Sequence, residues 1–223
     1  MNGRRSCLSN KKVGVIAGGL VDTQMGVDFL VSKGLSAHPY PAAKEAREQA
    51  EFQIASIEVL TNKIRKLFEQ IIGDGMASVM IYCNSLSSTV DMQQLSEEFK
   101  IKIVTPLQAY AKLASQYSSL GVLAGNNQGL AGIERSILQV NKSCTVIGLS
   151  MLPLVLEIEK KTLPSIIIER FSLKTVLKMF EQLGVDALIL GCTHFPYLYD
   201  ELVKHTTVPI LDPAELMYTM LLQ

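Results

Sequence analysis

The chain has 223 residues, of which 48% are hydrophobic and 19% charged, enough apolar material for one large domain or two lobes of about 100 residues each. Lys plus Arg equals Asp plus Glu at 21 each, and no basic stripe with interleaved aromatic residues occurs, which argues against a nucleic-acid partner. No apolar run reaches the roughly 18 residues of a membrane span, and residues 1–12 do not lead into a signal-peptide core. We therefore expect a cytoplasmic protein with no membrane association.

Strands and helices are expected to alternate along the chain. Short apolar runs predict strands at residues 13–16, 79–82, 101–104, 120–124, 145–149, 187–190 and 208–211. Helical spacing of apolar residues predicts helices over 25–31, 42–72, 90–99, 107–118, 129–140 and 173–183. Residues 38–41 are expected to form a loop, because two prolines within three residues oppose a helix. This alternation predicts an α/β protein with parallel sheets and right-handed crossovers.

A weak internal repeat runs through the sequence. Residues 14–19 read GVIAGG, and residues 121–126, which begin 107 positions later (121 minus 14), read GVLAGN. Cys83 and Cys192 are separated by a similar 109 positions (192 minus 83). These offsets predict a duplicated unit with a Gly-rich loop after its first strand and a cysteine loop after a later strand.

Each of two apolar runs ends on a cysteine that is followed by polar residues. Residues 79–85 read VMIYCNS and residues 188–194 read LILGCTH. Both patterns are typical of buried strands that open into polar loops, where parallel-sheet proteins place their chemistry. Isolated cysteines at strand ends are usually small core residues, but the paired occurrence favours a function for Cys83 and Cys192.

Two thiols presented in the same way suit a reaction at both faces of one carbon. One base removes the α-proton of an amino acid, and a second group returns a proton to the opposite face. A cysteine can act as such a base because protein surroundings can bring the pKa of a thiol near neutrality. Asn84, Ser85, Thr193 and His194 are expected to bind the substrate carboxylate or to orient the thiols.

The two Gly-rich loops are candidate carboxylate sites. Backbone N–H groups of Gly18 and Gly19 in the first repeat, and of Gly125 and Asn126 in the second, could donate to a carboxylate at a helix N-terminus. A nucleotide site is weakly supported, because Gly18 and Gly19 lack the GxGxxG frame.

Cys7 and Cys144 are not expected to take part in a reaction. Cys144 opens an apolar strand and is expected in the core, and Cys7 lies in the polar leader. Wide spacing and the missing secretion signal favour reduced thiols. With only three histidines and no CxxC motif, no metal site is expected.

At these residues the chain resembles the aspartate/glutamate racemase superfamily. The segment Cys83-Asn84-Ser85 is similar to its first Cys-Asn-Thr/Ser motif, and residues 191–196, GCTHFP, resemble the second cysteine motif of glutamate racemases. Residues 152–157, LPLVLE, resemble a segment that ends in an active-site glutamate, which makes Glu157 a possible supporting residue. Residues 211–215, LDPAE, resemble the C-terminal Ile-Asp-Ser-Ala-Glu.

The resemblance implies a fold and a reaction. It implies two pseudo-symmetric α/β lobes, each a parallel sheet flanked by helices, with the active site in the cleft between them. The lobes would comprise residues 1–105 plus 207–223, carrying Cys83, and residues 106–206, carrying Cys192. It also implies no pyridoxal phosphate, no metal, a small amino-acid or dicarboxylate substrate, and a homodimer.

Departures from the motifs leave the substrate open between aspartate and glutamate. Ala17-Gly18-Gly19 stands where glutamate racemases carry Asp-Ser-Gly, and residues 125–128, GNNQ, replace the usual threonines. His194 stands where aspartate racemases carry Glu. We expect cofactor-independent racemisation by two-base proton transfer between Cys83 and Cys192.

Other activities remain as alternatives. The chain could be a superfamily cis-trans isomerase or decarboxylase of a small carboxylic acid, or a non-catalytic small-ligand-binding protein. A disulfide switch between Cys83 and Cys192 would require lobe movement, because two bases that flank a carbon lie too far apart for a bond.

Overall fold

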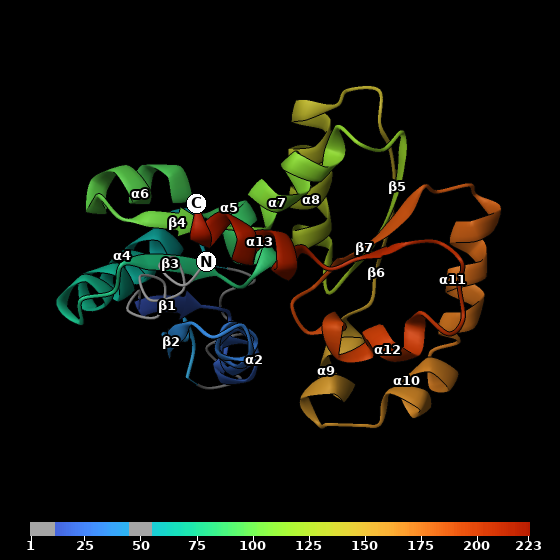
Figure 1. Cartoon of the computed structure of the whole chain (residues 1–223), viewed down its shortest axis with the longest axis horizontal. Helices are drawn as coiled ribbons and strands as arrows, with labels where there is room; N and C mark the ends of the chain where they lie inside the picture. The colour runs from blue at the N-terminus through green and yellow to red at the C-terminus, as the bar shows by residue number, and fades with distance from the viewer. Residues whose placement is uncertain (1–11, 45–54) are drawn as a thin grey trace, which may run out of the picture. The chain divides into compact units, whose positions relative to one another are not determined.

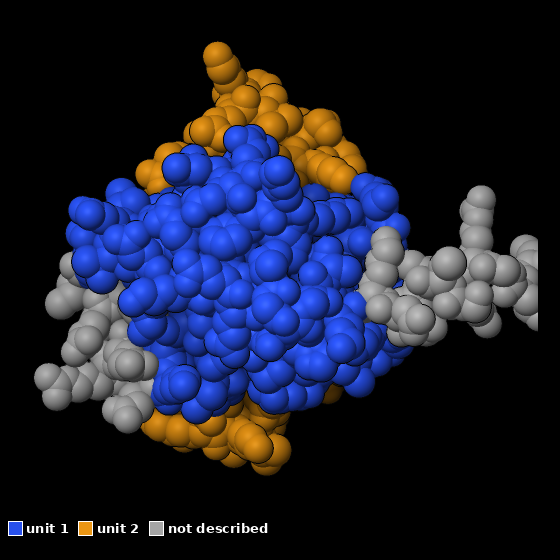
Figure 2. Space-filling view, turned by 90° about the vertical axis from the view of Figure 1, so that its left-hand side faces the viewer, with its two compact units in different colours: residues 1–106, 216–223 blue, residues 107–215 orange. Residues whose placement is uncertain are grey.

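The computed structural model describes residues 12–44 and 55–223. The chain divides into two compact units, which Figure 2 distinguishes by colour. Unit 1 comprises residues 1–106 and 216–223, and unit 2 comprises residues 107–215. The polar leader with Cys7, and part of the helix predicted over 42–72, lie outside the described residues.

Unit 1 contains a four-stranded parallel sheet flanked by helices (Figure 1). Its strands are β1 (Lys12–Ile16), β2 (Ser36–Pro39), β3 (Ser78–Ile81) and β4 (Lys102–Val104), in the order β2-β1-β3-β4. The helices are α2 (Leu20–Ser32), α4 (Ile57–Gly73), α5 (Asn84–Thr89), α6 (Met92–Phe99) and the last part of α13 (Pro213–Leu222).

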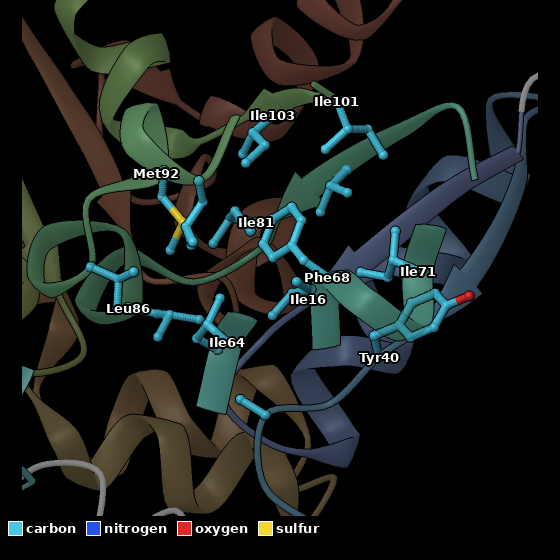
Figure 3. Packing of buried hydrophobic residues seen from close by; sticks show 14 of the residues in the cluster. Ile16, Tyr40, Ile64, Phe68, Ile71, Ile81, Leu86, Met92, Ile101 and Ile103 are labelled. Atoms are coloured by element: carbon cyan, nitrogen blue, oxygen red, sulfur yellow. The ribbon is translucent and has the colours of Figure 1, made fainter. Parts of the chain in front are cut away.

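The core of unit 1 forms because α4 is amphipathic and β3 is buried along its whole length. Leu60, Ile64, Phe68 and Ile71 recur at helical spacing and are all buried. Side chains of this helix and of the sheet gather in the cluster drawn in Figure 3. Phe68 also stacks on Phe99, with ring centroids 5.4 Å apart.

Unit 2 contains a second four-stranded parallel sheet of the same design. Its strands are β5 (Ser119–Ala124), β6 (Thr145–Ser150), β7 (Ala187–Gly191) and β8 (Ile210–Leu211), in the order β6-β5-β7-β8. The helical segments are α7 (Pro106–Ala114), α8 (Asn127–Val140), α9 (Leu152–Glu159), α10 (Pro164–Arg170), α11 (Leu173–Gln182), η1 (Phe195–Leu198) and α12 (Tyr199–Leu202). The predicted α/β class with two parallel sheets flanked by helices is confirmed.

The two sheets share their strand register as well as their order. Ile16 of β1 lies opposite Ile81 of β3, and Leu123 of β5 lies opposite Leu190 of β7. The first members of these pairs are 107 positions apart (123 minus 16), and the second members are 109 apart (190 minus 81). The offsets predicted from the sequence therefore describe a structural repeat.

Several elements differ from the sequence prediction. The expected loop at 38–41 includes the end of β2, an edge strand, where a terminal proline is tolerated. Helix α4 begins at Ile57, after Ser56 caps it by accepting the Val59 N–H at 3.3 Å. Helices α9 and α10 were not predicted, because their short, apolar segments lack a clear helical period.

The boundary between the units also requires a correction. The chain leaves unit 1 at Pro106, one residue beyond the predicted end of the first segment. Residues 207–215, which were assigned to the first lobe, belong to unit 2, because β8 pairs in parallel with β7. The return to unit 1 occurs at Leu216, within α13.

Membrane-spanning helices are not found among residues 12–44 and 55–223, since none of the helices there is both long and apolar enough.

Candidate active site

Cys83 stands at the junction between the buried strand β3 and helix α5. It is the N-cap residue of α5, with an extended backbone, and its Sγ lies 3.4 Å from the Ser85 hydroxyl. The Ser87 hydroxyl donates to the Cys83 carbonyl at 2.7 Å, which fixes the turn. Asn84 is buried, with 5% of its surface exposed. Unit 1 therefore presents Cys83 and Ser85 side by side at the carboxyl end of a central strand.

Cys192 occupies the corresponding place in unit 2. Cys83 and Cys192 each come two residues after the paired β3 or β7 position that the repeat relates. The Cys192 Sγ lies 3.7 Å from Nδ1 of His194, and Thr193 and His194 are both buried. The second cysteine motif thus brings a thiol and an imidazole together.

His194 connects Cys192 to a carboxylate that was not predicted. Its Nε2 lies 3.2 Å from Oε1 of Glu159, while its Nδ1 faces the thiol. A carboxylate on one ring nitrogen orients the imidazole and selects which nitrogen carries the proton. Cys192, His194 and Glu159 therefore form a chain of three groups that can orient the thiol and share its proton.

Glu159 could have been found only by recognising α9. In a helix, residues four positions apart share a face, so Glu159 lies on the same face as Val155. Val155 in turn packs in the cluster that includes Cys192. Residues 152–159 have no clear helical period, so the prediction there rested on the resemblance, which indicated Glu157.

Glu157, the supporting residue predicted from the resemblance, contacts Lys160, Thr162 and Arg170 in this structure, and its role in an active site stays a prediction. Its carboxylate accepts from Lys160 at 3.0 Å, from Thr162 at 2.9 Å, and from Arg170. Hydrogen bonds from Lys160 and Thr162 lower the pKa of Glu157 below its ordinary value. These bonds tie the end of α9 to α10.

The first Gly-rich loop is occupied by the protein's own carboxylate. Asp22 is buried, with 3% exposed, and accepts the Gly18 N–H at 2.9 Å and the Gly19 N–H at 2.7 Å. The carbonyls of Ala17 and Gly18 accept backbone N–H groups from the chain after β2. In this structure the Gly18 and Gly19 N–H groups donate to Asp22, and the predicted role of these residues toward a substrate stays a prediction.

The second loop builds the same helix cap with the roles exchanged. Asn126 is the N-cap of α8, and its Oδ1 accepts the Gly129 N–H at 2.8 Å. In the first repeat the N-cap is Gly19, and Asp22, three positions later, supplies the side chain. The capping side chain comes from the third helical residue, Asp22, in the first repeat and from the N-cap residue itself, Asn126, in the second. Asn126 therefore has a structural role at the start of α8.

Cys144 lies in the core of unit 2. Cys144 packs in the core as expected, and its burial, with the nearby charge of Asp186, raises its pKa. Clusters of three or more His, Cys, Asp or Glu side chains able to hold a metal are not found in the part of the chain that the structure describes.

The sequence is similar to those of proteins named glutamate racemase. It is 25% identical over 221 residues to the glutamate racemase of Limosilactobacillus reuteri strain DSM 20016, covering 93% of this chain and 78% of that protein. It is 27% identical over 168 residues to the glutamate racemase of Desulforudis audaxviator, covering 71% of this chain and 60% of that protein. The match therefore spans less than two thirds of the Desulforudis protein. No family model matches the chain.

Solved structures share the fold over nearly the whole chain. Glutamate racemase from Francisella tularensis in complex with D-glutamate aligns with a TM-score of 0.75 and 21% identity, covering 96% of this chain and 80% of that one. Aspartate racemase from Picrophilus torridus aligns with a TM-score of 0.70 and 18% identity, covering 95% and 93%. The chain therefore shares the fold of these racemases, and its sequence is similar to proteins named glutamate racemase. Within this fold, Glu159 and not Glu157 lies beside His194.

Proposed function

We propose that this protein is a member of the aspartate/glutamate racemase superfamily and a cofactor-independent racemase of aspartate or glutamate, with Cys83 and Cys192 as its two bases. The observation that carries the proposal is the register of the two sheets, which puts each thiol at the same place in a repeated unit. Each cysteine follows a central strand and adjoins a polar side chain, Ser85 or His194. Similarity to proteins named glutamate racemase supports an acidic amino acid as the substrate.

The proposed reaction needs one thiolate and one thiol. The thiolate removes the α-proton, and the electron pair left on the carbon is delocalised into the adjacent carboxylate. The other thiol then delivers its proton to the opposite face, which inverts the centre and exchanges the roles of the two sulfurs. The opposite enantiomer is converted by the reverse sequence.

Side chains beside the thiols would bind and orient the substrate. We assign Asn84, Ser85 and Thr193 to hydrogen bonds with the amino acid, since their side chains offer both donors and acceptors. His194, held by Glu159 at 3.2 Å, would orient the Cys192 thiol and share its proton. Asn126 caps α8, and its backbone N–H would donate to the substrate carboxylate.

The proposed partners are the amino acid itself and a second copy of the chain. A homodimer would have twice the mass of the 24.5 kDa monomer. Size-exclusion chromatography with light scattering tests this directly, and a monomeric mass throughout the working concentration range would contradict it.

The proposal is tested by α-proton exchange in deuterated water, followed by NMR and chiral chromatography. Both enantiomers of aspartate and of glutamate are incubated with the protein. Deuterium entering the α-position of one amino acid, with inversion, supports racemisation and names the substrate. Binding without exchange would favour a small-ligand-binding protein, and a new product would favour an isomerase or a decarboxylase.

The two-base scheme is tested by removing each sulfur separately. Cys83→Ala and Cys192→Ala should each lower racemisation by about 1000-fold or more, since a positioned acid–base group contributes roughly 10²–10⁴ in rate. Cys144→Ala provides the control, because that thiol lies in the core. Full racemisation with either Cys83 or Cys192 absent would refute the scheme.

A further inference from the structure

Gly125 lies directly against the thiol of Cys192. A Cβ atom built on Gly125 would stand 2.8 Å from the Cys192 Sγ and 3.3 Å from Cγ2 of Val155. The first distance is shorter than a carbon and a sulfur can approach without displacement. The thiol can therefore lie over the backbone of this loop only because residue 125 has no side chain.

The backbone at position 125 does not itself require glycine. The glycines with positive φ among the described residues are Gly34, Gly75 and Gly184, and Gly125 is not one of them. Alanine could therefore adopt the same backbone conformation at this position. The close approach to Cys192 is what the missing side chain provides.

Two groups lie close to the Cys192 Sγ. They are the backbone of Gly125 and the imidazole of His194, whose Nδ1 is 3.7 Å from the sulfur. The loop is itself anchored, because Asn126 caps α8 through its bond to the Gly129 N–H. A small change at Gly125 would consequently move the sulfur more readily than it would move the loop.

We propose that Gly125 is a positioning residue, which sets where the Cys192 thiol sits for proton transfer. This rests on the proposed racemase function. The Cβ of an alanine at 125 would lie 3.4 Å from the Cys192 Cβ and 3.3 Å from the Val155 Cγ2, so rotation of the Sγ relieves the one severe overlap and a small shift of the Val155 side chain relieves the other. Gly125→Ala should therefore fold normally with the thiol displaced.

Displacement of the thiol should slow racemisation without preventing binding. A misplacement of about 1 Å can cost about 100-fold in rate, so we expect kcat to fall about 10- to 100-fold, with KM changing less than about threefold. Gly73→Ala is the matched control, because a Cβ there meets nothing within 4 Å. It should leave the rate unchanged.

A substrate that carries a leaving group allows the contributions of the two thiols to be measured separately. With the 3-chloro derivatives of aspartate and glutamate, loss of the α-proton is followed by departure of chloride, which leaves a carbon–carbon double bond. The resulting enamine takes up water to give the 2-oxo acid and ammonia. Only the deprotonating thiol is needed, so each enantiomer reports on one cysteine, and Cys192→Ala shows which enantiomer depends on Cys192.

Chloride release then decides between positioning and a general structural effect. In Gly125→Ala, elimination from the Cys192-dependent enantiomer should fall about tenfold or more, while the other enantiomer changes less than about threefold. An equal loss for both enantiomers, or no loss for either, would overturn the proposal.

Thiol labelling tests the same inference without any activity. Alkylation by iodoacetamide, followed by peptide mass spectrometry, gives the rate for Cys192 relative to Cys83 in the same molecule. Gly125→Ala should change the Cys192 rate by about threefold or more and leave Cys83 unchanged, because reactivity follows the surroundings of the sulfur. Should the wild-type protein neither racemise nor eliminate, the proposed function fails, and an unchanged labelling ratio would separately overturn the role of Gly125.

Discussion

Two glutamates of α9 show how two positions along a helix separate a site from a structural cluster. Glu159 lies 3.2 Å from His194, whereas Glu157 accepts from Lys160 and Thr162. The pair offers a matched test, since both side chains leave the same helix.

Glu159→Gln should lower kcat about tenfold or more, because the amide no longer stabilises or orients the imidazole as a carboxylate does. The effect should be accompanied by a changed pH profile of kcat, which a purely structural role would not produce. Kinetics of both variants check this: Glu157→Gln should retain the wild-type kcat. Equal losses in the two variants would contradict the assignment.

Glu157 should instead influence stability in acid. Hydrogen bonds from Lys160 and Thr162 lower its pKa in the folded state, so the folded protein binds the carboxyl proton less readily than the unfolded chain does. The resulting stabilisation is present above the ordinary carboxyl pKa of about 4.3 and is lost as the pH falls through the lowered value.

Thermal unfolding followed by circular dichroism at several pH values measures this contribution. Glu157→Gln should have a lower midpoint than wild type at pH 7, and the two midpoints should converge as the pH falls through the lowered pKa of Glu157. A constant difference at every pH would show that the charge of Glu157 is not the cause.

Single residues were predictable where a local pattern carries the chemistry. Cys83 and Cys192 are marked by apolar runs that end on a thiol, and the structure puts both after central strands. No local pattern identifies Asp22 or Glu159. The partner of Asp22 follows from a helix cap, and the partner of Glu159 follows from packing between α9 and the chain after β7. Gly18 and Gly19 were assigned to a substrate because the sequence could not show that Asp22 already binds their N–H groups.

At the scale of elements, the two equivalent helix caps should differ in their importance for stability. Asp22 accepts two N–H groups of the Gly18–Gly19 loop from a buried position, whereas the Asn126 side chain accepts one, from Gly129. Asp22→Ala should cost about 2–4 kcal/mol, since buried N–H groups would lose a charged acceptor. Asn126→Ala should cost about 1 kcal/mol.

Urea unfolding of the two variants measures these costs. An Asp22→Ala variant as stable as wild type would contradict this prediction. So would an Asn126→Ala variant that loses more free energy of unfolding than Asp22→Ala does.

Elements were predictable in proportion to the strength of their hydrophobic pattern. The fully buried strands β3 and β7 have continuous apolar runs and were placed within one residue. The edge strand β2 is only partly buried and ends in proline, so its four residues resemble a loop. The position of strand β8 was predicted, but the strand was assigned to the wrong unit. Its pairing with β7 joins segments far apart in the sequence, and a local pattern does not indicate such pairing.

At the scale of the whole molecule, unit 1 is discontinuous in sequence. Its second segment, residues 216–223, includes the buried Met217 and Leu221. The Met220 carbonyl accepts from Lys102 Nζ at 2.6 Å, and the Tyr218 hydroxyl donates to the Lys33 carbonyl at 3.5 Å. The C-terminal residues therefore belong to the packing of unit 1.

Deletion of residues 216–223 should destabilise unit 1 more than unit 2. Hydrogen exchange read by mass spectrometry should show faster exchange in β1 and β3, with β5 and β7 much less affected, because stability is distributed over cooperative units. Substitution of Gln223 alone, at the exposed end, is the control. Uniform acceleration in both sheets would indicate a single cooperative unit instead.

The same discontinuity orders the events of synthesis. Residues 107–215 form one uninterrupted segment, so all of unit 2 is available before the residues that complete unit 1 have been joined to the chain. Domains generally fold as units while the chain emerges from the ribosome. The growing chain must therefore carry the first sheet, whose four strands all lie within residues 12–104, through the entire translation of residues 107–215 before the segment 216–223 can pack on unit 1.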